Sequence, residues 1–133
     1  MGSFNDPISD LLTQIKNAGN AKKRYFDISH SKLKENVVHI LKDKGFIAHF
    51  LVKEENKKPV MRIFLKYSPT RESIVNGLKR MSKPSLRRYV SHKQIPSVLK
   101  GMGISIISTS QGVLDGQSAR NKKLGGELLC LVW

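Results

Sequence analysis

Apolar residues recur at helical spacing in two segments of the first half of the chain. The first follows Asn5-Asp-Pro-Ile8, where a cap residue precedes a proline suited to a first helical turn, and it ends before Gly19. This pattern predicts a helix over residues 7–18. A second stripe, capped by Ser31 or Ser29 and stopped by Gly45, predicts another helix. Its apolar members are Leu33, Val37, Val38, Ile40 and Leu41.

Three further segments of this half are rich in aromatic and branched residues, as strands are. They are residues 24–29, 46–52 and 60–67. The polar residues 56–59 separate the last two segments, which predicts an antiparallel hairpin with a polar tip. The order α-β-α-β-β indicates a small sheet with both helices on one face.

The second half of the chain is expected to be mostly antiparallel β with short helices. Ser68-Pro69-Thr70 punctuates the chain and predicts a boundary between a domain of residues 1–67 and one of residues 68–133. Strands are predicted over residues 86–90, 103–109 and 127–133, and short helices over residues 94–99 and 115–121. Apolar spacing alone also fits a helix over residues 74–81. The predicted fold class is therefore α+β, in two small domains.

The charge of the chain indicates what kind of partner the protein binds. The formal net charge is +14, and no acidic residue occurs between Glu72 and Asp115. A solvated surface normally mixes charges of both signs, so an acid-free stretch favours a polyanion, with nucleic acid first. A merely soluble basic surface remains the alternative. The cations of this stretch are Lys79, Arg80, Lys83, Arg87, Arg88, Lys93 and Lys100.

Catalytic and cofactor chemistry find little support in the sequence. The four histidines lack metal-ligand spacing, and neither a G-x-S-x-G elbow nor a phosphate-binding P-loop occurs. A ribonuclease could pair His92 with a carboxylate, but none is near it in sequence, and Cys130 is the single cysteine. We therefore expect no enzyme, no metal and no cofactor. No apolar run approaches the roughly 18 residues of a membrane span, so a cytoplasmic protein without a membrane partner is expected.

Residues 107–113, Ile-Ser-Thr-Ser-Gln-Gly-Val, place three adjacent hydroxyls at the end of a predicted strand. A phosphorylation site, a turn closed by a hydroxyl, and a surface that hydrogen-bonds a polar partner all remain open. Hydroxyls both donate and accept, and the wide minor groove of duplex RNA exposes 2′-OH groups and base edges to short polar side chains. Gly112 would let the backbone pass close to such a ligand.

Several motifs occur in one order along essentially the whole chain. The longest is residues 103–113, followed by Ala119-Arg120 and by Leu124-Gly-Gly-Glu127 with its apolar tail. The others are Asp6-Pro-Ile8, Leu12-Thr-x-Ile-x-Asn17, Ser31-Lys-Leu-Lys34, Leu41-x-x-x-Gly-Phe-Ile47 and Ser82-Lys-Pro-Ser-Leu-Arg-Arg-Tyr89. Together they closely resemble the family of bacterial small-subunit ribosomal protein eight.

The resemblance implies a two-domain fold, in which residues 74–81 contain a strand rather than a helix. It also implies direct binding to the central domain of small-subunit ribosomal RNA and a role in subunit assembly and translation. Expected partners are that RNA, neighbouring small-subunit proteins and, as family members can, the protein's own messenger RNA; outside the ribosome a monomer is expected. The chain departs from the family at Gln111, where lysine is common, and in the amino-acid sequence of residues 114–117.

The RNA-facing residues that the resemblance implies are Ser108, Thr109, Ser110, Tyr89 and Glu127. From charge and position we add Gly112 and, for phosphates, Lys83, Arg87 and Arg88, with a weaker second contact at Ser31, Lys32 and Lys34. Tyr89 could stack on a base or pack in the core, and Glu127 could accept a hydrogen bond from a base amino group or merely start a solvated strand. The alternative function is a general basic nucleic-acid-binding or RNA-chaperone protein without a fixed site.

Overall fold

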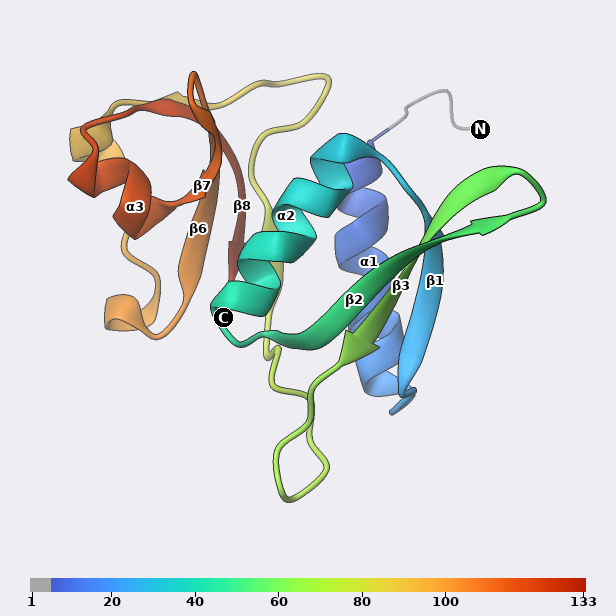
Figure 1. Cartoon of the computed structure of the whole chain (residues 1–133). Helices are drawn as coiled ribbons and strands as arrows, with labels where there is room; N and C mark the ends of the chain where they lie inside the picture. The colour runs from blue at the N-terminus through green and yellow to red at the C-terminus, as the bar shows by residue number, and fades with distance from the viewer. Residues whose placement is uncertain (1–5) are drawn as a thin grey trace. The chain divides into compact units, whose positions relative to one another are not determined.

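The computed structural model describes residues 6–133 (Figure 1). The chain forms two compact units, one of residues 10–76 and one of residues 77–133 together with residues 6–9. The N-terminal elements are α1 (Pro7–Asn20), β1 (Tyr25–Ser29), α2 (Lys32–Asp43), β2 (Ile47–Glu55) and β3 (Lys58–Leu65). The C-terminal elements are β4 (Leu78–Arg80), β5 (Tyr89–Val90), β6 (Ile104–Thr109), β7 (Gly112–Asp115), α3 (Gly116–Asn121) and β8 (Gly126–Val132).

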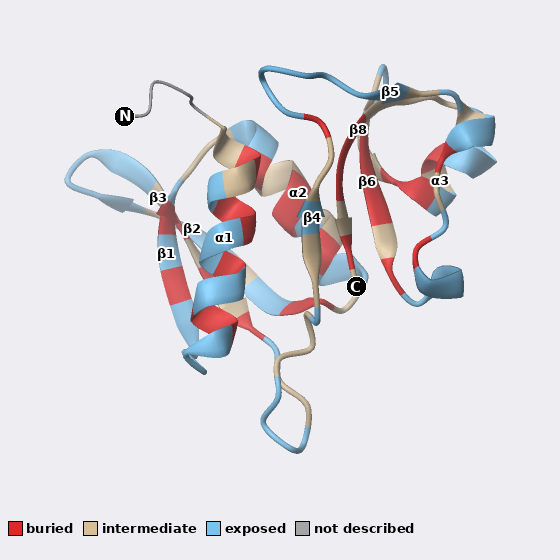
Figure 2. Cartoon of the chain, turned by 180° about the vertical axis from the view of Figure 1, so that it is seen from behind, coloured by how far each residue is buried: buried red, intermediate tan, exposed pale blue. Residues whose placement is uncertain are grey.

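The first unit is a three-stranded antiparallel sheet in the order β1-β3-β2, with α1 and α2 against the same face (Figures 1 and 2). Alternate strand residues such as Phe26, Ile28 and Ile63 are buried on the helix side, where the apolar stripes of both helices meet them. The burial colours of Figure 2 show this alternation along β1. The sheet's other face carries no helix of this unit.

Local signals set the ends of these elements. Asp6 accepts a hydrogen bond from the backbone N–H of Ser9 at 3.2 Å at the start of α1, while Asn5 lies outside the described residues. Ser31 caps α2 by accepting from the Lys34 backbone N–H at 3.2 Å. The β2–β3 hairpin turns on two residues alone, Asn56 and Lys57, with φ of 52° and 62°. β2 therefore extends beyond its predicted end at residue 52, and β3 begins before its predicted start at residue 60.

The second unit is an antiparallel sheet in the order β4-β8-β6-β7, with β5 also paired to β8. Asp115 caps α3 through a hydrogen bond from the Ser118 backbone N–H at 3.2 Å. Buried Ile107 and Leu128 of the sheet pack with Ala119 of α3 and with Ile95. Two single turns of 3₁₀ helix, His92–Gln94 and Leu99–Gly101, complete the unit.

The predicted fold class is confirmed, as are both N-terminal helices and the strand near residue 78. Helical spacing over residues 74–81 was misleading because this segment pairs with the distant C-terminus. The backbone N–H of Gly77 donates to the Trp133 carbonyl at 2.9 Å, and the Trp133 N–H donates back at 3.0 Å. A Cβ on Gly77 would lie 2.3 Å from the Trp133 indole, so glycine fits this close approach.

The predicted helix over residues 94–99 is wrong. Ile95 is extended, with φ of −64° and ψ of 122°, because a following proline disfavours helical geometry in the residue before it. The strand predicted over residues 86–90 is shorter than expected and keeps only Tyr89 and Val90. The domain boundary between residues 67 and 68 stays a prediction; it falls in the loop between β3 and β4.

Candidate nucleic-acid interface

Three of the expected RNA-facing residues lie side by side across three strands. Tyr89 of β5 is directly opposite Glu127 of β8, and Glu127 is directly opposite Ser108 of β6. Residues opposite each other on antiparallel strands project from the same face, so these three form one line, here called the polar row. The next pair along, Ile107 and Leu128, points to the other face and into the core.

Tyr89 is a surface residue of the polar row. It is 70% exposed, the most of any tyrosine among the exposed large hydrophobic residues of the described chain. Packing in the core, one of the two roles considered for it, therefore does not describe this side chain. Its ring and hydroxyl are available to a partner, as a stacking surface or as a donor and acceptor.

Glu127 is held in place by side chains of the β4–β5 segment. One carboxylate oxygen accepts hydrogen bonds from the Ser82 hydroxyl and, at 2.9 Å, from the Arg87 guanidinium. Ser82 is fully buried, and its hydroxyl oxygen accepts from the Arg88 backbone N–H at 3.1 Å. Glu127 is thus fixed in orientation and paired with a cation. Sequence reasoning assigned no role to Ser82, because nothing in sequence shows that a serine 45 residues from Glu127 meets it.

The three adjacent hydroxyls have three different environments. Thr109 closes the β6–β7 turn: its hydroxyl donates to the Gly112 carbonyl at 2.7 Å and accepts from the Gln111 N–H at 3.1 Å. Ser108 lies in the polar row, and Ser110 is exposed at the turn. Gly112 has a φ of +105°, in the region that favours glycine. A turn closed by a hydroxyl is therefore confirmed at Thr109, whereas a surface for a polar partner at Ser108 and Ser110 stays a prediction.

Two glycines let the strands approach each other beneath the polar row. A Cβ on Gly126 would lie 2.1 Å from the Ser108 carbonyl oxygen, and one on Gly125 would lie 2.5 Å from the Val90 carbonyl oxygen. Neither distance is possible for a real side chain. Glycine at both positions therefore sets the spacing between β5, β8 and β6 on which the polar row depends.

The expected phosphate ligands border the polar row. Lys83 and Leu86 are joined by two backbone hydrogen bonds of 3.0 Å, which close a tight turn ahead of Arg87 and Arg88. The Arg88 carbonyl accepts from the Leu128 N–H at 2.9 Å, which ties this segment to β8. Lys83 and Arg88 are exposed, and the Arg87 side chain is 48% exposed although it pairs with Glu127. Cations thus stand beside the polar row on a fixed backbone.

Comparison with known proteins identifies the family of this chain. Residues 6–133 match the family model described as ribosomal protein S8. The chain belongs to the ribosomal protein S8 family. It is 59% identical to the small ribosomal subunit proteins uS8 of Chlamydia pneumoniae and Chlamydia caviae over 133 residues, all of each chain. It is 50% identical to that of Protochlamydia amoebophila over 129 residues, which is 96% of this chain and 97% of the relative.

Membership in the S8 family makes the chain a protein of the small ribosomal subunit with a part in translation, and not an enzyme. Burial raises the pKa of the Cys130 thiol to about 12, so this cysteine is no nucleophile at neutral pH. Among residues 6–133 no group of three or more His, Cys, Asp or Glu side chains could hold a metal ion. No helix in that range is long and apolar enough to cross a membrane.

The second expected contact of this S8 protein lies in the unit of residues 10–76, around the start of α2. Ser31 is engaged as the cap, and Lys32 is exposed. Lys34 is only 5% exposed, and its ammonium donates to the Ser29 hydroxyl at 2.9 Å. Burial lowers the pKa of Lys34. The negative charge of Asp10 raises this pKa, but by less than burial lowers it. Of these three residues, Lys32 is the one that presents its charge to solvent.

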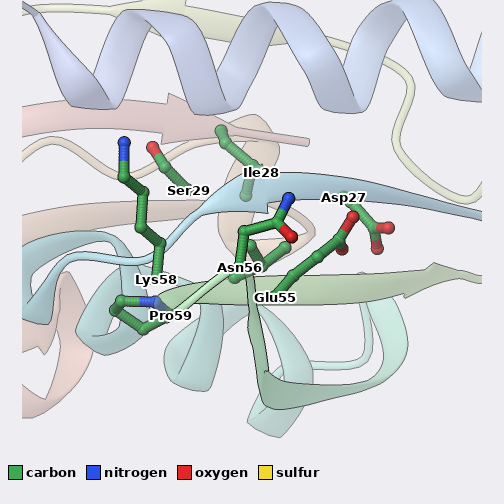
Figure 3. A pocket seen from close by; sticks show the side chains of 8 residues that line it. Asp27, Ile28, Ser29, Glu55, Asn56, Lys58 and Pro59 are labelled. Carbon is green, nitrogen blue, oxygen red and sulfur yellow. The ribbon is translucent and has the colours of Figure 1, made fainter.

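A hollow of about 450 Å³ lies beside this region, between the end of β1 and the β2–β3 hairpin (Figure 3). The side chains of Ser29 and Lys58 point to the same side, and the carboxylates of Asp27 and Glu55 lie at the other end (Figure 3). Asp27 is already bound by Arg62 at 2.9 Å and 3.1 Å. The hollow therefore holds charges of both signs that partly satisfy one another, and it shows no arrangement for catalysis.

Proposed function

We propose that this S8 protein binds the central domain of small-subunit ribosomal RNA directly, through the polar row, and that this binding supports subunit assembly. One observation carries the proposal: Tyr89, Glu127 and Ser108 are in register on one face of the sheet, beside a segment that contains cations and no acids. A flat line of one aromatic, one acceptor and one hydroxyl suits the shallow minor groove of an RNA helix.

Each member of the polar row would recognise a different feature of the RNA. The Ser108 hydroxyl can donate to or accept from a ribose 2′-OH or a base edge. Tyr89 can stack on a base or hydrogen-bond through its hydroxyl. Glu127 accepts only, so it selects an amino group on a base, and its ion pair with Arg87 reduces the repulsion that phosphates would exert on it.

The surroundings of the polar row would supply affinity that does not depend on RNA sequence. Lys83 and Arg88 are assigned to phosphates, and Arg87 is shared between phosphate and Glu127. Ser110 and Gly112 lie at the exposed β6–β7 turn, where Gln111 offers a neutral amide in place of the lysine common in the family. Thr109 would act by holding that turn. Ser31 and Lys32, with Lys34 behind them, form the weaker second contact.

The remaining partners follow from the family. We propose contacts with neighbouring small-subunit proteins, a monomeric state outside the ribosome, and binding to the protein's own messenger RNA. A general basic RNA-binding or RNA-chaperone protein is the competing function, because the net charge of +14 alone would attract any polyanion. The fixed geometry of Glu127 favours a specific site, since a nonspecific surface has no use for an oriented carboxylate.

The test replaces Ser108 and Ser110 by alanine, singly and together, and measures binding to the cognate RNA helix and to an unrelated duplex. The double variant should lose on the order of 1–3 kcal/mol on the cognate helix and little on the unrelated one. We expect Ser108 to account for most of the loss, because it lies in the polar row. Equal losses on both RNAs would refute direct readout, and displacement of the wild type by excess unrelated RNA at physiological salt would favour the RNA-chaperone alternative.

A further inference from the structure

The uncovered face of the N-terminal sheet carries a second line of planar side chains. Tyr25 of β1 is directly opposite Phe64 of β3, and Phe64 is directly opposite His49 of β2. This line, here called the ring row, projects away from α1 and α2, since Phe26 and Ile63 beside it are buried on the helix side. Tyr25 is 40% exposed and His49 is exposed. The solvent face of an antiparallel sheet is normally polar, so three rings in line call for an explanation.

The rings of the ring row contact one another in a column, and a guanidinium contacts the ring at one of its ends. Phe64 and His49 are stacked, with ring centres 4.2 Å apart and planes 16° apart, and Tyr25 is tilted against Phe64 at 5.6 Å. At the Tyr25 end, the Arg62 guanidinium lies 4.1 Å from the ring centre. At the other end His49 belongs to β2, an edge strand of the sheet. Because His49 is exposed, a further planar group can extend the column beyond its ring.

The charges around this end of the sheet fit an anion. Because the strands are antiparallel, the residues before β1, before β2 and after β3 all meet at the end that holds the ring row. Arg24 lies 6.0 Å from the centre of the Phe64 ring. Asp27, two residues from Tyr25 on the same face of β1, is paired with Arg62 at 2.9 Å. Asp43 contacts His39 at 3.8 Å. The cations of these bordering segments are Lys22, Lys23, Arg24, Lys44 and Lys66.

Planar rings beside cations match one ligand class better than others. An unpaired nucleotide offers a flat base for the column and a phosphate for the cations, in a single residue. An acidic protein segment would satisfy the cations but not the stacked rings. We propose that the ring row is a docking surface for unpaired RNA, in which one base stacks on the outward face of His49 and the adjoining phosphates lie near the bordering cations. It is separate from the polar row and does not depend on the function proposed for that row.

The test uses the full chain and a labelled six-nucleotide single-stranded RNA, with an abasic strand of the same length and charge as the reference. The wild type should bind the base-bearing strand about 5- to 100-fold more tightly than the abasic one. His49→Phe keeps a ring and should keep that preference, whereas His49→Leu, of similar size, should lose most of it. Leu51→Ala, on the same strand and face, is the control and should leave the preference unchanged. Thermal unfolding followed by circular dichroism confirms that each variant is folded.

Two results would overturn the proposal: a wild type that binds both strands equally, or a folded His49→Leu variant that retains full preference for bases. Displacement of the single strand by an acidic peptide with higher affinity would assign the face to a protein partner instead. Ser108→Ala distinguishes this surface from the polar row, because it should weaken the cognate helix and leave single-strand binding intact. Unchanged binding of the cognate helix by Ser108→Ala would count against the function proposed for the polar row alone, whereas retained base preference in His49→Leu would count against the ring row alone.

Discussion

At the scale of single residues, side chains far apart in the sequence hold one another in place through short polar contacts. The buried Ser82 hydroxyl links Glu127 to the backbone of Arg88. In the same unit the Asp6 carboxylate accepts from the Arg80 guanidinium at 3.2 Å, and Arg80 also donates to the Leu129 carbonyl at 2.6 Å. These contacts fix orientations that helical or strand periodicity leaves undetermined.

Asp6 should make the stability of the protein depend on pH. Burial raises the pKa of this carboxyl, but hydrogen bonds from Ser9 and Arg80 outweigh burial and leave the pKa below its ordinary value of 3.8. A carboxyl with a lowered pKa in the folded state stabilises the fold above the unfolded pKa. That contribution is lost as pH falls from about 4 downward through the folded pKa.

We therefore expect Asp6→Asn to lower the free energy of unfolding by about 1–3 kcal/mol at pH 7, because Arg80 loses its partner while its side chain is only 10% exposed. Urea unfolding at pH 7 and at pH 3 measures the effect. The variant should show a smaller drop between these two conditions than the wild type. Asp43→Asn, at an exposed carboxylate in α2, is the control and should keep the wild-type drop. An identical drop in Asp6→Asn and wild type would rule out this role of Asp6.

At the scale of elements, the spacing of β5, β8 and β6 depends on glycine at the start of β8. Gly126→Ala would drive a Cβ to within 2.1 Å of the Ser108 carbonyl oxygen, which is backbone and cannot rotate away. The strands would have to separate, at a cost of about 3 kcal/mol, the upper part of the usual range for overpacking. Gly112→Ala is the matched control. A Cβ added at this position would meet no neighbouring atom within 4 Å, so only the positive φ should lower the free energy of unfolding, by about 1 kcal/mol.

Urea unfolding of both variants measures this difference, and amide NMR shifts report which strands move. Gly126→Ala should shift the resonances of Tyr89, Glu127 and Ser108 together, since all three rest on the same spacing. Shifts confined to the β6–β7 turn are expected for Gly112→Ala. Equal destabilisation by the two substitutions would show that steric contact at Gly126 does not set the strand spacing.

Sequence patterns predicted the elements whose signals are local and missed those that depend on distant partners. The helix after Ser31 carries a cap residue and apolar spacing of its own, the short helix after Asp115 carries a cap residue, and both form. β4 has no such signal, because its strand geometry comes from pairing with β8 about 50 residues later. Resemblance to a family predicted it where periodicity did not. The resemblance also predicted the three residues of the polar row. Their alignment across β5, β8 and β6 became visible only from the strand register.

At the scale of the whole molecule, the acid-free segment and the exposed helix surfaces both contribute to a net charge of +14. Only cations that contact RNA phosphates displace bound counterions when the complex forms. A protein with a fixed site should therefore respond to the position of a lost charge, whereas a general basic binder should respond only to the number lost. This difference separates the proposed function from its competitor without reference to any particular nucleotide.

We expect the double replacement of Lys83 and Arg88 by glutamine to reduce the steepness of the plot of log binding constant against log salt concentration. The slope should decrease in magnitude by roughly 1.4–1.8, because each lost phosphate contact accounts for about 0.7–0.9. The control replaces Lys16 and Lys42, exposed on α1 and α2, by glutamine and removes the same charge. Its slope should change by much less, because both lysines belong to the unit of residues 10–76 and not to the unit that carries the polar row. Binding of the cognate helix is measured between about 50 and 200 mM salt. Equal flattening by both pairs would mean that the RNA is held by diffuse charge, as expected of an RNA chaperone without a fixed site.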